Sequence, residues 1–476
     1  MKDKNSRCLL LLTLLLLACS TRNQAAAQID DPAEEKLLRI AAIGIYGNEK
    51  TLDRYILLEL TFAAGDSLTI SALEKEVIIS RTNLMNTSLF LNHMIRIDYG
   101  HISDDDLVVV ITLYERWYLW PEPVLQNSDR NFNNWLKERD FGQLSYGINL
   151  IRENFRGRNE RFTLICQAGF DEKYEVTWQA PALRAGRDWG IGAGGGFQRN
   201  RRMAVNETDN RLLFAHADHT LALQGYGYLQ LHIRPAIRHF HTFSLSATHY
   251  SFNSGLLNLN PNFSPDNAMK FTRFDFIWMI KIDHRNHNAY PLQGYYLDAQ
   301  FRQLAIYSTL ANDKTSSSLE INARRFFRLT DRWHWGAGFT GFAATDPQPP
   351  FMFRYGLGYQ RNFVRGYEYY TVHGSRWALL KENLKFTLIP EKNLFLPFMP
   401  HEKFREGTLA LYLNLFSDAG YVSATDAVTS PLNNRWLTSF GVGLDLVTYY
   451  DKVLRIEWTL NNQRDAGVFV HFMAPI

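Results

Sequence analysis

After about residue 118 the sequence alternates apolar and polar side chains, and this alternation constrains the fold more than any other feature. Phe274, Phe276 and Trp278 share one face of an extended chain, while Asp275 lies on the other. A period of two residues is the signature of a β-strand with two different environments on its faces. The same pattern recurs in the segments 295–302, 319–324, 409–418, 440–446, 454–461 and 468–472.

Strand length and inner-face charge distinguish two β architectures, a soluble sandwich and a transmembrane barrel. The alternating runs cover about 10 residues or more, the length that crosses a bilayer at a barrel tilt, whereas sandwich strands usually have about 5 or 6. Charged side chains fall on the polar face, which a dry sandwich core would not accept but a wet lumen would. They are Arg302, Glu320, Arg324, Asp418, Asp445, Arg455 and Glu457. We therefore predict a transmembrane β-barrel over residues 118–476, with Cys166 facing lipid.

The strand count follows from the number of alternating segments. Residues 118–476 contain sixteen or seventeen of them, depending on how 211–234 is divided, and exported single-chain barrels have even numbers. We predict sixteen antiparallel strands, with the first near 118–127 or 141–152 and the last at 466–474. The longest polar interruptions are predicted to be surface loops: residues 200–210, 253–268, 308–317 and 361–375.

The first 28 residues are typical of an export signal. Lys2, Lys4 and Arg7 precede an apolar run that is too short to span a bilayer. Two processing routes remain open. Cys19 ends a lipoprotein-like box and would then be acylated, whereas the small residues ending at Ala27 suit ordinary cleavage.

Residues 37–117 predict a small α+β domain of βααββ order. An apolar strand ends at Gly47, Thr51 is placed to cap a first helix, and Ser71 with Glu74 forms a capping box for a second helix through about residue 84. Two strands, at 89–99 and 107–116, complete the sheet. We therefore expect one compact domain before the barrel.

Composition argues against several functional classes. The net charge of +3 and the absence of a basic cluster give no electrostatic case for nucleic acid. The tetrapeptide from Gly65 to Leu68 matches a hydrolase motif, but it lies where a turn is expected, and no flanking catalytic block accompanies it. His239 and His241 share a strand face and are more simply wall residues than metal ligands. We expect no enzyme activity, no catalytic residue, no cofactor and no metal.

A short aromatic loop carries the most specific signal. Val364-Arg365-Gly366-Tyr367 resembles the loop motif of the bacterial surface-antigen (D15-like) family, the BamA/TamA-like outer-membrane assembly and transport barrels. The segment 416–420 resembles the wall motif of that family, with Asp418 and Gly420 in the matching places. The resemblance implies that the loop folds into the lumen and that Arg365 meets Asp418. Strand parity independently places Asp418 on the lumen face.

One departure from the family concerns the strand after the loop. Where the family usually has a lumen-facing glutamate, the sequence places Lys385, together with Lys381 and Asn383, while Glu382 falls on the lipid side. We therefore expect Arg365 to have one acidic partner instead of two.

The predicted N-terminal domain resembles a single POTRA domain. The resemblance implies a bacterial outer-membrane protein whose POTRA-like domain lies in the periplasm. It also implies a role in insertion or translocation of other polypeptides, with client strands adding to an exposed sheet edge. Expected partners are unfolded or exported polypeptides, outer-membrane lipid and accessory periplasmic proteins. Two alternatives stay open: a passive diffusion channel, and a surface-antigen protein that binds a partner.

Overall fold

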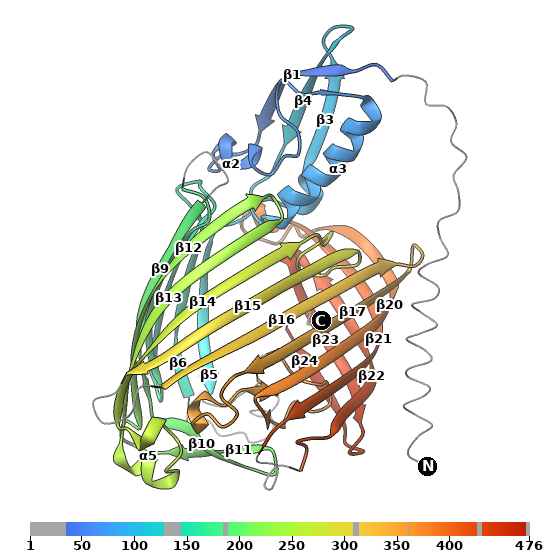
Figure 1. Ribbon diagram of the computed structural model, residues 1–476. Helices are drawn as coiled ribbons and strands as arrows, with labels where there is room; N and C mark the ends of the chain where they lie inside the picture. Colours follow the sequence, from blue (N-terminus) through green and yellow to red (C-terminus); the bar gives the residue numbers. More distant parts are fainter. Residues whose placement is uncertain are drawn as a thin grey trace.

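A computed structural model describes residues 35–127, 144–183, 189–307, 314–359, 361–425 and 431–472. Sixteen antiparallel strands form one curved sheet, and a small α+β unit lies at one end of it (Figure 1). The predicted mainly-β fold with sixteen barrel strands is confirmed. The strands are β5 (Leu119–Asn127), β6 (Leu144–Phe155), β7 (Glu160–Gly169), β8 (Glu172–Ala180), β9 (Trp189–Asn200), β12 (Ala222–Ala236), β13 (His239–Phe252), β14 (Lys270–Asp283), β15 (Gly294–Tyr307), β16 (Lys314–Arg328), β17 (Trp333–Ala344), β20 (Arg376–Phe395), β21 (Glu406–Ser423), β22 (Trp436–Thr448), β23 (Lys452–Asn461) and β24 (Ala466–His471).

The outer surface of the sheet is apolar because the alternation is kept in register from strand to strand. Trp278 of β14 pairs with Phe301 of β15 and with Phe243 of β13, and all three side chains point outward. Trp278 is 38% exposed, whereas the neighbouring inward residue Asp275 is 4% exposed. Directly opposed residues share a face of the sheet, so each apolar row continues around the barrel.

The lumen, predicted to be wet, has a cavity on one side and closely packed side chains on the other. Beside β14–β16 a cavity of about 790 Å³ is lined by Arg302, Glu320 and Arg324, as expected for a hydrated wall. On the opposite wall, Asp445 and Arg455 are fully buried. The reason is that an inserted loop and Tyr290 fill that side of the barrel, and Tyr290 donates a 2.7 Å hydrogen bond to Asp445.

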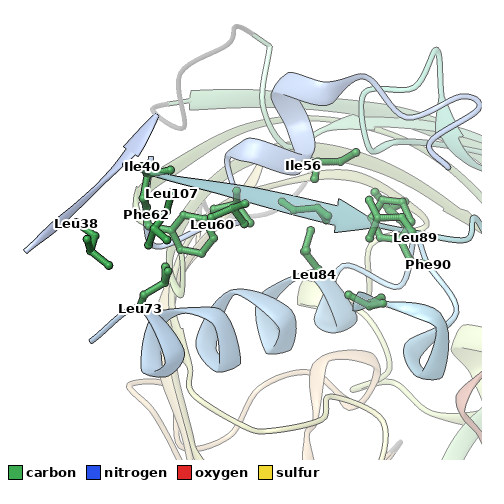
Figure 2. Packing of buried hydrophobic residues seen from close by; sticks show 14 of the residues in the cluster. Leu38, Ile40, Ile56, Leu60, Phe62, Leu73, Leu84, Leu89, Phe90 and Leu107 are labelled. Carbon is green, nitrogen blue, oxygen red and sulfur yellow. The ribbon is translucent and has the colours of Figure 1, made fainter. Parts of the chain in front are cut away.

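The N-terminal unit is a four-stranded sheet in the order β2-β1-β4-β3 with helix α3 on one face. Figure 2 shows Leu73 and Leu84 of α3 turned toward Ile40 and Leu107 of the sheet. These side chains are at most 1% exposed, so the unit has its own hydrophobic core. The elements are β1 (Leu38–Tyr46), α2 (Asp53–Leu57), β2 (Ser67–Leu68), α3 (Ile70–Asn86), η1 (Asn92–Met94), β3 (Arg96–His101) and β4 (Asp106–Thr112).

Details of this unit differ from the sequence prediction. The N-cap of α3 is Thr69, whose Oγ1 accepts from the Ala72 N–H, so Ser71 and Glu74 do not form the capping box. Thr51 does not cap α2, because its hydroxyl instead donates to Glu115 at 2.6 Å. The segment before β3 forms a 3₁₀ turn, since the chain must turn to place Phe90 in the core.

Connections at the end opposite the N-terminal unit form a second apolar cluster. Hairpin β10–β11 (Arg202–Thr208 and Arg211–His216) and helix α5 (Ser254–Leu259) lie at that end (Figure 1). Val205 of the hairpin packs in one cluster with Leu256, Leu257 and Phe263. Two predicted surface loops, 200–210 and 253–268, are therefore partly regular structure. In the described part of 308–317, β16 begins at Lys314.

Three sequence expectations fall outside the described ranges: the export signal of residues 1–28, the acylation of Cys19 and the final residues 473–476. None of the helices in the described ranges has both the length and the hydropathy that a membrane-spanning helix requires.

Candidate functional site

The loop of residues 361–371 lies inside the barrel instead of on its surface. It joins two short strands, β18 (Gly356–Leu357) and β19 (Val372–His373), which pair with each other. Within it, the Tyr367 N–H donates to the Val364 carbonyl at 3.0 Å, which closes a tight turn around Arg365 and Gly366. The predicted surface position of 361–375 is thus wrong for this stretch, because its apolar side chains pack against the inner wall.

Arg365 is the centre of the site and is 1% exposed. Its Nε donates to Asp418 Oδ2 at 2.9 Å and its Nη2 to Asp418 Oδ1 at 2.5 Å, a bidentate pair. The Arg365 backbone N–H also donates to Asp418, at 3.0 Å. Such a fork is the strongest form of a charge-assisted hydrogen bond and fixes orientation as well as distance.

The remaining guanidinium donors are also satisfied. Nη1 donates to Asn383 Oδ1 at 2.7 Å and to Glu457 Oε1 at 3.3 Å, and Nη2 donates to the Glu382 carbonyl at 3.3 Å. The guanidinium carbon lies 3.8 Å from the centroid of the Phe416 ring. The cation is therefore held by two carboxylates, one amide, one carbonyl and one aromatic face.

Glu457 corrects the expectation of a single acidic partner for Arg365. It lies on β23 and is fully buried, and its Oε1 lies 3.6 Å from Arg455 Nη1 as well. Strand parity had placed Glu457 on the lumen face, but parity alone does not reveal which distant strand faces the loop. Lys385 occupies the expected glutamate position and lies instead with its ammonium 3.9 Å from the Tyr290 ring centroid.

Gly420 and Gly366 are sites of close approach between the loop and the wall. A Cβ atom added to Gly420 would lie 2.6 Å from Val364 and 2.7 Å from Leu357. Gly366 has φ +86, and a Cβ there would lie 3.1 Å from Thr459 Oγ1. Both positions therefore favour glycine, Gly366 for its left-handed backbone as well.

Tyr367 and Val364 complete the set of predicted loop residues, and both are at most 2% exposed. The Tyr367 hydroxyl donates to Asn462, beyond the end of β23. The Asn461 side-chain amide donates to the Gly366 carbonyl at 2.8 Å. The structure thus brings together all of the sequence-predicted site residues of the loop and the wall.

Sequence reasoning missed a second set of contacts, made by the β10–β11 hairpin. Asn210, at the tip of the hairpin, is fully buried. Its carbonyl accepts from the Thr371 N–H at 2.7 Å, and its Oδ1 accepts from the Leu432 N–H at 2.9 Å. The Glu207 carboxylate also contacts the His373 imidazole. The hairpin therefore reaches across to the inserted loop, a contact between segments 161 residues apart that no local pattern signals.

A third set of contacts fixes the N-terminal unit to the opposite end of the barrel. Arg234 of β12 forms a bidentate pair with Glu59, with both distances 2.7 Å. Arg116 pairs with Asp451 in the β22–β23 turn at 2.6 Å. The bidentate pair of Arg234 with Glu59 and the pair of Arg116 with Asp451 together restrict rotation of one body against the other.

The two histidines that the sequence places on one strand face lie on the barrel's surface. His239 and His241 lie on the outer face of β13, where His241 stacks on Trp278 with ring centroids 6.5 Å apart. Among the described residues, no group of three or more His, Cys, Asp or Glu side chains could hold a metal ion.

Comparison with known proteins shows likeness in structure without likeness in sequence. No protein-family model and no curated protein matches the chain. Three similar solved structures each cover 91% of this chain. BamA from Haemophilus ducreyi lacking POTRA domains 1–3 is 12% identical, with 83% of its chain covered and a TM-score of 0.49. CdiB from Acinetobacter baumannii is 14% identical, with 74% covered and a TM-score of 0.48.

CdiB from Escherichia coli is 13% identical, with 75% of its chain covered and a TM-score of 0.51. At this identity the likeness shows the fold. It agrees with the resemblance that the loop and wall motifs indicated. The chain is a sixteen-stranded barrel of the fold seen in CdiB from Escherichia coli.

Proposed function

We propose that this protein lies in the bacterial outer membrane and acts, without reaction chemistry or a cofactor, in the insertion or translocation of other polypeptides. The observation that carries the proposal is the loop held inside the barrel by Arg365. Arg365 ties the loop to Asp418 of β21 and Glu457 of β23, so the loop occupies the lumen and braces one stretch of the wall. A barrel that handles polypeptides needs an element that both occupies the lumen and braces the wall near the junction of its first and last strands.

The seam between the first and last strands supports this proposal. The order of the sheet runs from β24 to β5, and among the described residues no ladder joins these two strands. Among the residues that the structure describes, β24 pairs with β23 over six positions, from Arg455 opposite His471 to Leu460 opposite Ala466. A short terminal strand has few main-chain hydrogen bonds, so separating it costs less than separating two long central strands.

The N-terminal unit offers an edge to which a client can add. Strand β3 pairs only with β4 among the described strands, which leaves the other side of Arg96–His101 without a ladder. An extended polypeptide can add there by main-chain hydrogen bonds with little regard for its sequence. In this proposal the unit is POTRA-like and periplasmic, and its contacts with the β12–β13 end of the barrel hold it at the entrance.

Depletion combined with crosslinking tests the proposal. A photoreactive residue in place of Tyr99 on β3 should crosslink to exported polypeptides in cells, and depletion of the protein should remove specific barrels or surface proteins from the outer membrane. The matched control places the same photoreactive residue at Ile78, an exposed position on α3. Unchanged outer-membrane content together with equal crosslinking at both positions would refute a role in handling polypeptides.

A diffusion channel is the second candidate, and the luminal cavity is the observation that favours it. The cavity of about 790 Å³ is lined by five arginines and two carboxylates: Arg273, Arg302, Arg324, Arg354, Arg361, Glu320 and Asp346. A pore with this lining would prefer anions. A steady, anion-selective conductance in planar bilayers, with no effect of depletion on other outer-membrane proteins, would support the channel.

A further inference from the structure

The outer surface of β16, β17 and β20 carries one cation and one carboxylate in a single row. Arg325 is the ladder partner of Ala337, and Ala337 is the ladder partner of Glu382. Directly opposed residues point to the same side of a sheet. Trp333 and Phe339, which share the face of Ala337 on β17, are 38% and 45% exposed, so this face is the apolar outer one. Arg325 and Glu382 therefore flank Ala337 on the surface that meets lipid.

Neither charge is neutralised within the described part of the chain. Arg325 lies over the rings of Tyr295 and Phe327, at 5.5 and 5.0 Å, and forms no ion pair with a described residue. The Glu382 carboxylate likewise has no hydrogen-bond donor among the described residues. On β20 it lies between the outward-facing Leu380 and Leu384. Ionised groups on a lipid-facing surface are unfavourable, and an unpaired one marks a site with a missing partner.

We propose that the missing partner is a second copy of this chain, bound about a two-fold axis that passes beside Ala337. Strands in a sheet lie about 4.8 Å apart, so Arg325 and Glu382 flank Ala337 at nearly equal distances on opposite sides. A rotation of 180° about the membrane normal exchanges these two sides. Arg325 of each copy then faces Glu382 of the other, which gives two identical ion pairs across one isologous interface.

The shape of the surface suits a close approach at the axis. Ala337 and Gly341 leave little side chain on the outer face of β17, while Trp333 and Phe339 supply apolar area around them. Barrel strands tilt by about 40°, so the row that contains Arg325 and Glu382 is inclined and the paired groups differ in depth by about 6 Å. The long Arg325 side chain can cover this difference. Only the backbone carbonyl of Glu382 contacts Arg365 in the lumen, whereas its side chain lies on the outer face.

Charge reversal in the purified full chain tests the proposal. The native protein in detergent should have the mass of a dimer by light scattering. Arg325→Glu and Glu382→Arg should each weaken dimerisation by about tenfold or more, because like charges then face each other. The double variant Arg325→Glu with Glu382→Arg should restore the dimer. A native chain that is monomeric at all concentrations, or a double variant that stays dissociated, would overturn the proposal.

Mixing the two single variants distinguishes ion pairs between two chains from an ion pair within one chain. The Arg325→Glu chain carries two acidic groups at the interface and the Glu382→Arg chain carries two basic ones, so a mixture should form a heterodimer although each variant alone does not. Ala337→Cys should also form a disulfide-linked dimer under mild oxidation, whereas the parent chain, whose Cys166 lies on β7, sets the background. Failure of both the heterodimer and the crosslink would mean that lipid alone covers this surface.

Discussion

Arg365 and Asp418, 53 residues apart in the sequence, form a bidentate ion pair inside the barrel. Both side chains are almost completely buried. The pair joins an inserted loop to strand β21. It does not stand alone, because Glu457 of β23 lies 3.3 Å from the same guanidinium. Through these two carboxylates, one side chain connects the loop to the two strands that flank β22, in addition to its contacts with β20.

Removal of either member of this pair should destabilise the barrel strongly. Arg365→Ala leaves two carboxylates buried without their cation, and Asp418→Ala leaves the cation without its main partner, so each should cost about 3–5 kcal/mol. The double variant should cost much less than the sum, because the two residues share one interaction. Thermal unfolding in detergent and migration of unboiled samples on gels measure this effect.

Arg376→Ala is the matched control for the pair, because Arg376 is an exposed arginine at the start of β20. It should change the unfolding temperature little. Additive losses in the double variant Arg365→Ala with Asp418→Ala would show that the two side chains act independently.

Close packing at Gly420 predicts a second effect on the loop. Gly420→Val places methyl groups where Val364 and Leu357 already lie, so the loop should leave the wall and become accessible to protease. Val364→Ala should partly restore protection in the Gly420→Val background, because it removes one of the two clashing side chains. Gly227→Ala on β12 is the control, since the nearest atom to a Cβ there lies 3.8 Å away. Equal protease sensitivity in both glycine variants would contradict the packing argument.

Local sequence patterns predicted much of the fold for a physical reason. Alternation along the chain sets which face of a strand meets lipid, so the outward position of Trp278 and the inward position of Asp418 could be read from parity. Contacts between distant segments could not be predicted in this way, because parity gives the face on which a residue lies but not the residue that it contacts inside the lumen. Glu457 was placed on the correct face, yet its contact with Arg365 became visible only in three dimensions.

Loops were harder to predict than strands. Residues 361–371 are rich in tyrosine and charge, and their inserted position followed from the family resemblance and not from composition. The contact of Asn210 with Thr371 and the pair of Arg234 with Glu59 join parts of the chain that share no local pattern. Such contacts depend on the curvature of the sheet, which brings segments distant in the sequence together at each end of the barrel.

The hairpin contact predicts a specific local opening. Asn210→Ala removes side-chain hydrogen bonds to the Thr371 carbonyl and the Leu432 N–H, which leaves buried backbone groups unsatisfied at a cost of about 1–3 kcal/mol. Hydrogen exchange should therefore increase in 202–216 and 371–373 while the barrel strands keep their protection. Thr208→Ala, an exposed change in the same hairpin, is the control. Unchanged exchange in the Asn210 variant would show that the remaining backbone hydrogen bond from Thr371, the Glu207 contact and the apolar cluster around Val205 hold the hairpin.

Docking of the N-terminal unit should weaken in acid because of Asp451. Burial alone would raise the pKa of this carboxyl, but the hydrogen bond with His287 and the charge of Arg116 outweigh burial and hold the pKa well below its usual range. Only the part of this lowering that Arg116 causes depends on docking, because His287 belongs to the barrel. That part of the stabilisation is complete above the free pKa of about 3.9 and is lost as pH falls below it. Protease cleavage between the unit and the barrel should therefore be slow at neutral pH and faster in acid. Asp451→Asn should weaken docking at neutral pH and remove most of this pH dependence, since the amide neither titrates nor pairs with Arg116. A variant that keeps the native pH profile would assign the acid sensitivity to another contact, with Glu59 and Arg234 the next pair to test.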